Sequence, residues 1–293
     1  MNWKSRVSLI VLAGLALTTF ITPLHAGQCA GTKEKPESEL TFKRLFTDKD
    51  FESESFGPIR WLEDGSGYTT LEKSEDFEEA KDIVKYDPAT GQGHILIAAK
   101  NLIPEGKKEP LEIKDYAWSD DGSKLLVYTN SVKVWRLETR GDYWLYDIES
   151  GRLRQLGGDA EESMMMFAKF SPDGEKVGYV YKRDIYVQDL DTMRIKQLTD
   201  TGSDTIINGT ADWVYEEEFH LRDGFSFSPD GKYIAYWNFD TSGVKEFKII
   251  NYTAGRYPEI MKYKYPKVGT TNSAVRIGVV KVTGGKTKWL DTN

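Results

Sequence analysis

Three adjacent glutamates follow two aromatic residues in the segment Asp212–Glu218, DWVYEEE. Such a group of carboxylates can bind a cation through charge-assisted hydrogen bonds. Side chains alternate between faces along a strand, so neighbouring carboxylates that point the same way require a helical turn or a bulge. Their mutual repulsion is tolerated in water or opposite a cation. These residues alone leave two interpretations open, a cation-binding site and a solvated acidic loop.

Short strands must position this segment. Apolar and polar residues alternate over stretches of five to eight residues, as in Lys124–Thr129 and Lys232–Trp237, and no long period of 3.6 residues follows residue 26. Asp-Gly, Gly-Lys and Thr-Gly turns separate the stretches and supply the positive φ angles of tight hairpins. The pattern predicts an all-β fold.

One unit recurs four times: an aromatic residue, a short polar turn closed by Asp-Gly, and then a strand. The four glycines are 52 to 57 residues apart, slightly more than the repeat of about 40–50 residues in four-stranded propeller blades. We therefore predict a partial β-propeller of about four four-stranded antiparallel blades. The four units are Trp61–Gly65, Trp118–Gly122, Phe170–Gly174 and Phe227–Gly231.

Four such blades make about half of a large propeller. Propellers close with about four to eight blades, so a small closed ring is the alternative, but no closing strand is visible after Lys286–Asp291. We expect an incomplete ring, truncated before closure. Its unpaired strand edges predict a mature chain that is oligomeric or prone to aggregation.

The first residues predict export. Lys4 and Arg6 precede an apolar run over residues 7–21, and the segment ends at Ala26, a small residue typical of a signal-peptidase site. The run is shorter than the about 20 residues of a comfortable membrane span, which favours a signal peptide over residues 1–26 rather than an N-terminal anchor. The remaining domain, residues 27–293, is then periplasmic or extracellular.

Composition limits the partners and cofactors. The formal net charge is −7 for the whole chain and −9 for residues 27–293, which disfavours nucleic acid as a partner. Cys29 is the single cysteine, so no intrachain disulfide or cysteine-based metal site can form. We predict no cofactor and no metal. Asn208-Gly-Thr210 and Asn251-Tyr-Thr253 match the glycosylation pattern, which is common by chance.

Five stretches of the sequence together match one known family, and the likeness extends over nearly everything after the predicted signal. The stretches are DWVYEEE (Asp212–Glu218), VKVWR (Val132–Arg136), RGDYWLYD (Arg140–Asp147), WNFDTSGV (Trp237–Val244) and YPEI…YPKVGTTNSAVRIGVV (Tyr257–Val280). In these stretches the chain resembles the N-terminal β-propeller of the dipeptidyl peptidase IV family of serine exopeptidases. DWVYEEE is the most specific of the five.

The resemblance implies substrate-binding roles for three residues. In this family the last two glutamates of DWVYEEE, here Glu217 and Glu218, bind the free α-amino group of the substrate. The arginine of the VKVWR stretch, here Arg136, contacts the carbonyl of the penultimate residue. An ammonium about 4 Å from a carboxylate gains on the order of 4 kcal/mol at an effective dielectric near 20. Holding the terminus at a fixed distance from a nucleophile selects the release of dipeptides.

The catalytic half of the family is not visible in this sequence. That half is an α/β-hydrolase domain with a G-x-S-x-G nucleophile motif followed by Asp and His. The chain has no G-x-S-x-G, and after residue 26 its histidines are His94 and His220. Neither accompanies a recognisable nucleophile, so we predict no catalytic residue here and interpret His220 as a loop side chain.

Two functions follow from the resemblance. The first is the propeller portion of a secreted peptidase that acts on peptides with a free amino terminus, favouring Pro or Ala in second position. A missing or separately encoded hydrolase domain would then be a partner of this chain, which alone is predicted inactive. The alternative is a non-catalytic propeller that binds peptide amino termini or acts as a scaffold.

Overall fold

The computed structural model describes residues 40–48, 50–53 and 57–292. The predicted signal peptide and Cys29 lie outside the described residues. The chain divides into two compact units, Met1–Glu54 and Ser55–Asn293. In the first, the described part contains one π-helical turn, η1 (Lys43–Thr47). Within the described ranges, no helix is long and apolar enough to cross a membrane.

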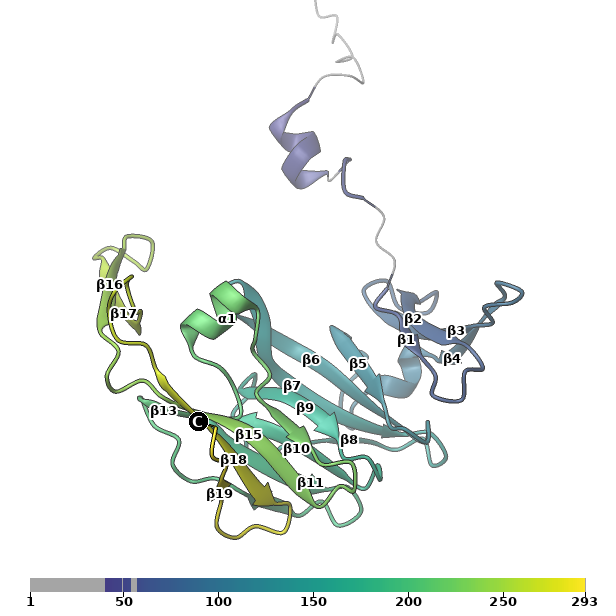
Figure 1. Cartoon of the computed structure of the whole chain (residues 1–293). Coiled ribbons are helices and arrows are strands. Elements are labelled where there is room, and N and C mark those ends of the chain that lie inside the picture. The colour runs from purple at the N-terminus through teal and green to yellow at the C-terminus, as the bar shows by residue number, and fades with distance from the viewer. Residues whose placement is uncertain (1–39, 49, 54–56, 293) are drawn as a thin grey trace, which may run out of the picture. The chain divides into compact units, whose positions relative to one another are not determined.

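The second unit is built from antiparallel sheets whose strands group into four blades in chain order (Figure 1). Blade 1 contains β1 (Arg60–Trp61), β2 (Tyr68–Lys73), β3 (Lys81–Tyr86) and β4 (Gly93–Ile97). Blade 2 contains β5 (Asp115–Trp118), β6 (Lys124–Val134), β7 (Leu137–Asp147) and β8 (Leu153–Gln155). Blade 3 contains β9 (Met165–Phe170), β10 (Lys176–Tyr181), β11 (Asp184–Asp189) and β12 (Ile195–Gln197). Blade 4 contains β14 (Phe225–Phe227), β15 (Tyr233–Asp240), β18 (Ala274–Lys281) and β19 (Lys288–Trp289).

Additional elements accompany the blades, most of them at blade 4. A short strand, β13 (Ile206–Asn208), pairs with the far end of β15, and the helix α1 (Trp213–Phe219) connects β13 to β14. A separate hairpin, β16 (Glu246–Asn251) and β17 (Glu259–Lys264), is inserted between β15 and β18. A 3₁₀ turn, η2 (Ala99–Leu102), follows β4.

Each predicted aromatic-turn-glycine unit connects the first strand of a blade to the second. In blade 2 the Ser119 hydroxyl donates to Asp121 Oδ1 at 2.6 Å, and the Gly122 amide donates to the Ser119 carbonyl at 2.8 Å. Gly122 has a φ of 69°, which a residue with a side chain rarely adopts. Blades 3 and 4 repeat the serine–aspartate hydrogen bond in their own turns. These turns are local structures, which is why the sequence predicts them.

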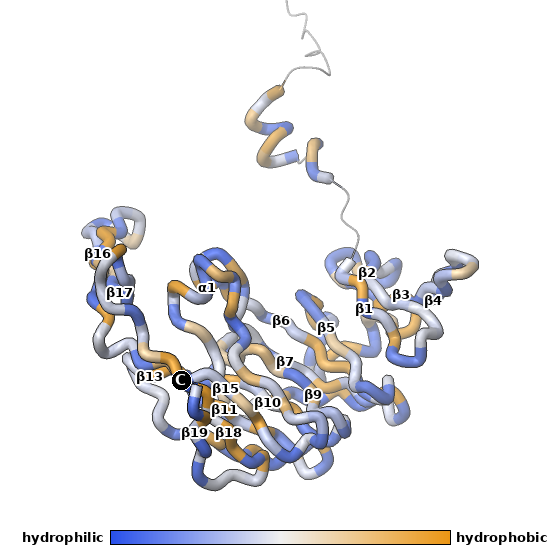
Figure 2. Tube along the Cα trace, in the orientation of Figure 1, coloured by the Kyte–Doolittle hydropathy of each residue, from blue (hydrophilic) through white to orange (hydrophobic). Residues whose placement is uncertain are grey.

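The blades pack face to face, so both faces of a central strand are buried. In β6, Leu125 and Val127 join an apolar cluster with blade 1, whereas Leu126 joins a cluster with blade 3. A third cluster, which includes Val180 and Ile234, lies between blades 3 and 4. Figure 2 shows apolar residues along the strands and hydrophilic residues in many of the turns.

The predicted all-β, open propeller is confirmed. None of the sheets in the described residues closes on itself, and β19 pairs with β18 of its own blade. Blades 2 and 3 form one eight-stranded sheet, because Gly141 of β7 pairs with Met165 of β9.

Candidate functional site

The acidic segment forms α1, and its first residue anchors the helix. Asp212 accepts a hydrogen bond from the backbone amide of Tyr215 at 3.1 Å, the arrangement expected of an N-cap. The other carboxylate oxygen of Asp212 accepts from the Ser273 hydroxyl at 2.5 Å. The helix ends at Phe219, and its C-cap, His220, is exposed and has a left-handed φ of 57°. Both ends of α1 are therefore fixed by specific local geometry.

The three glutamates lie in a helical turn and have three different environments. Successive side chains on a helix are about 100° apart, so the carboxylates do not share one direction. Glu216 is buried at 8% exposure, the Glu217 side chain is 6% exposed, and Glu218 is exposed. The helical turn keeps the acidic segment from being a uniformly solvated loop.

Arg136 reaches Glu217 from blade 2. It lies at the tip of the β6–β7 hairpin, where Val134 and Leu137 form the last ladder pair. Its Nε is 2.7 Å from Oε2 of Glu217. The Arg136 side chain is 85% exposed, so water screens the pair from one side. The structure thus brings two of the three predicted site residues into direct contact, and Glu218 follows them on the exposed side of α1.

Glu217 has one oxygen paired with Arg136 and one without a hydrogen-bond partner among the described residues. Its Oε1 is buried and has no hydrogen-bond partner in the described part of the chain. An unsatisfied buried carboxylate oxygen is costly, because it has lost water without gaining a donor. A ligand that offers a positively charged donor, such as an α-ammonium group, would satisfy it.

Glu216 is buried beside Arg222 and not beside Arg136. Its Oε1 lies 3.7 Å from Nε of Arg222, beyond hydrogen-bond range but close enough for charge attraction. Burial raises the pKa of Glu216, although Arg222 opposes this shift. We interpret Glu216 as a structural residue that differs from its two neighbours.

An aromatic group beside the ion pair is a feature that sequence reasoning missed. Trp135, Trp213 and Tyr263 come from blade 2, α1 and β17, and their rings contact one another through Tyr263. Two depressions next to this group, of about 660 and 500 Å³, share Trp135 and Glu216 in their walls, but neither is lined by Arg136, Glu217 or Glu218. Both volumes are within the range of ligand-binding clefts, about 300–1,000 Å³. Lys and Tyr alternate in residues 262–265, and this local pattern does not indicate that Tyr263 contacts Trp135 and Trp213.

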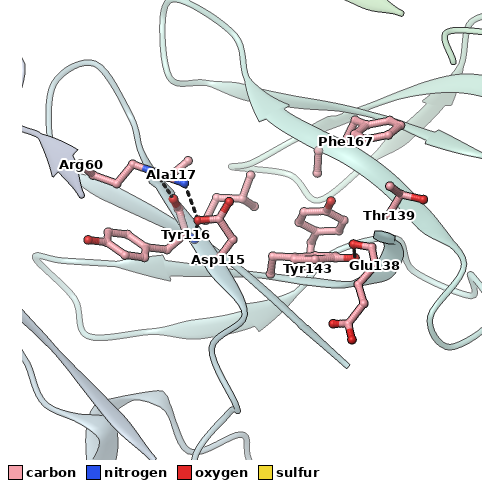
Figure 3. Close-up of a pocket in the computed structure, with 11 residues that line it drawn as sticks. Arg60, Asp115, Tyr116, Ala117, Glu138, Thr139, Tyr143 and Phe167 are labelled. Carbon is pink, nitrogen blue, oxygen red and sulfur yellow. Dashed lines mark hydrogen bonds and ion pairs between the residues drawn. The ribbon is translucent and has the colours of Figure 1, made fainter. Parts of the chain in front are cut away.

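A further pocket, of about 310 Å³, is lined by residues of β1, β5, β6, β7 and β9 in the first three blades (Figure 3). Its charged residues already have partners. Nη2 of Arg60 is 2.5 Å from Asp115, and Glu138 accepts a hydrogen bond from the Ser131 hydroxyl. Burial raises the pKa of Tyr116 to about 12, so its hydroxyl stays protonated. We therefore place the candidate site at α1 and not in this pocket.

No metal site emerges in the parts of the chain that the structure covers, which contain no cluster of three or more His, Cys, Asp or Glu side chains suited to an ion. The candidate site is thus Glu217, Glu218 and Arg136, next to the aromatic cluster of Trp135, Trp213 and Tyr263. Two carboxylates and an arginine can bind a cationic group together with a carbonyl oxygen.

Comparison with known proteins identifies the family. Residues 119–293 match the family model described as the dipeptidyl peptidase IV N-terminal region. The chain belongs to the dipeptidyl peptidase IV family. It is 30% identical to a probable dipeptidyl peptidase 4 of Aspergillus flavus over 98% of this chain, and 28% identical to the prolyl endopeptidase FAP of Mus musculus over 96% of this chain.

A solved member of the dipeptidyl peptidase IV family has the same fold. The crystal structure of dipeptidyl peptidase 4 from Porphyromonas gingivalis matches 86% of this chain with a TM-score of 0.75 and 29% identity. The chain spans about a third of the length of these relatives: 36% of the Aspergillus protein, 35% of the mouse protein and 35% of the Porphyromonas chain. The match supports the prediction of an N-terminal propeller portion.

Proposed function

We propose that this chain is the N-terminal propeller portion of a secreted serine peptidase that releases dipeptides, and that it binds the free amino terminus of the substrate. The relatives named dipeptidyl peptidase 4 support the reaction class. A preference for Pro or Ala in second position follows from the same family likeness. Export rests on the predicted signal peptide.

The Glu217 carboxylate carries this proposal. One of its oxygens pairs with Arg136, and the other is buried without a donor among the described residues. An α-ammonium group would supply that donor and would also donate to the exposed Glu218 carboxylate as a second acceptor. Arg136, exposed over most of its side chain, can at the same time donate to a peptide carbonyl. The site would then bind a positively charged group and a carbonyl group that lie at a fixed distance from each other in the peptide.

Bond cleavage requires a nucleophile that this sequence does not contain in a recognisable motif. In the proposed enzyme, a hydrolase domain on another segment or chain would attack the second peptide bond of the anchored substrate. Without such a domain, the same anchor would make a binding module for peptide amino termini. Because the sequence has no G-x-S-x-G motif, the binding module is retained as a second candidate function.

Calorimetry with the purified chain tests the anchor. The probes are the tripeptide Ala-Pro-Ala and its N-acetylated form. We expect the free peptide to bind more tightly than the acetylated peptide, and Glu217→Gln to remove the difference. Equal affinity for the two peptides would overturn the proposed anchor. A parallel assay with Gly-Pro-nitroanilide should show no turnover by the chain alone, and turnover blocked by a serine-directed inhibitor would contradict its predicted inactivity.

A further inference from the structure

The hairpin tip that carries Arg136 has little support of its own. Beyond the Val134–Leu137 pair, Trp135 and Arg136 form a two-residue loop. Trp135 has a φ of 53°, a left-handed conformation that is uncommon for a large aromatic residue. Because the Arg136 side chain is 85% exposed, few contacts of its own restrain it. The direction of Arg136 therefore depends on how Trp135 is held.

The inserted hairpin of blade 4 holds Trp135. The ring of Tyr263 in β17 lies 5.0 Å from the ring of Trp135, measured between centroids, at an interplanar angle of 56°. This is a favourable tilted arrangement for two aromatic rings. The contact joins blade 2 to a hairpin that follows it in the chain by more than one hundred residues.

The same tyrosine also contacts α1. Its ring centroid lies 5.8 Å from that of Trp213, the first residue of α1. Trp213 is one helical turn before Glu217. Tyr263 thus contacts the residue directly before Arg136 and the helix that carries Glu217, the two sides of the ion pair.

Tyr263 is itself supported within the hairpin. It pairs across the strands with Phe247, whose ring centroid is 5.9 Å away. Tyr265 contacts Tyr263 at 6.0 Å and Trp213 at 4.6 Å. A small aromatic core therefore ties the β16–β17 hairpin to the site.

We propose that Tyr263 is a positioning residue for the amino-terminus anchor: it fixes Trp135 against α1 and so holds Arg136 opposite Glu217. The inserted hairpin would then set the affinity of the site without touching the peptide. This role rests on the proposed function, because it concerns the binding of a peptide by Arg136 and Glu217. The geometric part, the restraint of the hairpin tip, stands without a peptide.

A double-mutant cycle on the full chain tests the positioning role. Calorimetry with Ala-Pro-Ala would compare wild type, Tyr263→Ala, Arg136→Ala and the double variant. An aromatic pair contributes at most about a tenfold change in affinity, so we expect Tyr263→Ala to weaken binding about fivefold to tenfold. In the Arg136→Ala background it should have no further effect, because the group that it positions is gone.

Two control variants separate positioning from general damage. Tyr263→Phe keeps the ring and should bind like wild type. Tyr257→Ala removes an aromatic side chain that is 81% exposed near the end of the same hairpin, and should also bind like wild type. Thermal unfolding of every variant would show whether the fold is retained.

Hydrogen exchange gives a readout that needs no ligand. The backbone amides of Arg136 and Leu137 should exchange faster in Tyr263→Ala than in wild type, Tyr263→Phe or Tyr257→Ala. Unchanged exchange at the tip, or equal losses of affinity with and without Arg136, would overturn the positioning role. Absence of any effect of Arg136→Ala and Glu217→Gln on peptide binding would instead refute the proposed function, while the exchange result would still decide whether Tyr263 restrains the tip.

Discussion

Glu218 directly follows Glu217 in α1, yet Glu218 is exposed whereas the Glu217 carboxylate is nearly buried and paired with Arg136. The helical turn separates the two side chains in direction. The two glutamates that the family likeness treats as one anchor are therefore not equivalent in this structure, and their substitution should have unequal effects.

Glu217→Ala should weaken the binding of Ala-Pro-Ala by about 2–5 kcal/mol, because the α-ammonium group of the bound peptide would lose its buried carboxylate partner. Glu218→Ala should cost about 1 kcal/mol or less, since an exposed pair is screened. Glu149→Ala, an exposed glutamate on a turn of blade 2, is the control and should change nothing. Calorimetry measures all three, and a larger loss for Glu218→Ala than for Glu217→Ala would contradict the assignment.

Asp184→Ala should destabilise the fold by about 3 kcal/mol, because three donors lose a buried acceptor at roughly 1 kcal/mol each. The donors are the Thr199 hydroxyl, the Asn208 amide and the backbone amide of Gly202. Urea unfolding at pH 7 measures the loss. Asp191→Ala, on an exposed turn of the same blade, should stay within about 0.5 kcal/mol of wild type. A similar result for both variants would show that the buried network contributes little.

Asp121 should contribute to stability in a pH-dependent way. The Ser119 hydroxyl donates to its carboxylate and lowers its pKa to about 2 from an ordinary value of 3.8. A carboxylate with a lowered folded-state pKa stabilises the fold above its unfolded pKa, and this contribution is lost as the pH falls toward 2.

Asp121→Asn should therefore cost about 1 kcal/mol at pH 7, given how exposed the turn is. The difference from wild type should shrink as the pH falls from about 4 to 2. Chemical unfolding over this pH range would measure it, with the adjacent exposed residue in Asp120→Asn as control. A difference that stays constant with pH would rule out the ionised carboxylate as its cause.

The purified chain without residues 1–26 should self-associate, because apolar side chains remain exposed on the inserted hairpin. Ile250 and Ile260 face each other across its two strands and are 50% and 62% exposed. Ile260→Glu should reduce the apparent mass in light scattering by lowering the apolar contact area. Val268→Glu, at a fully exposed position outside the hairpin, should leave it unchanged. A monomeric wild-type chain would contradict this prediction.

The sequence predicted the blades because their signals are local. The serine, aspartate and glycine of the turns in blades 2 to 4 interact within a few residues, and the continuous apolar run Leu125–Val127 is consistent with the two buried faces of β6. The roles of Glu217, Glu218 and Arg136 came from family likeness, and they stay predictions. The direct contact between Arg136 and Glu217 could not be read from the chain, because it depends on how separate blades are placed.

Tertiary burial also changes the meaning of a short motif. Asn208 heads a glycosylation pattern, but it is fully buried and its amide donates to Asp184 and Thr201. A three-residue pattern cannot indicate that its asparagine belongs to such a network of buried hydrogen bonds. The contact of Trp135 with Tyr263 was missed for the same reason, since nothing near either residue indicates the other.

The shared sheet of blades 2 and 3 has a consequence for how the molecule comes apart. The ladder pair of Gly141 with Met165 joins these blades into one sheet, and we expect them to unfold as one block. Blade 4 is joined to that block without a ladder pair among the described strands. Arg136 belongs to the block, whereas Glu217 stands on the connection to blade 4. A local opening between blades 3 and 4 would therefore separate the two charges while blades 2 and 3 stay folded, so the proposed binding of peptides should be lost at a lower denaturant concentration than the bulk of the β-structure.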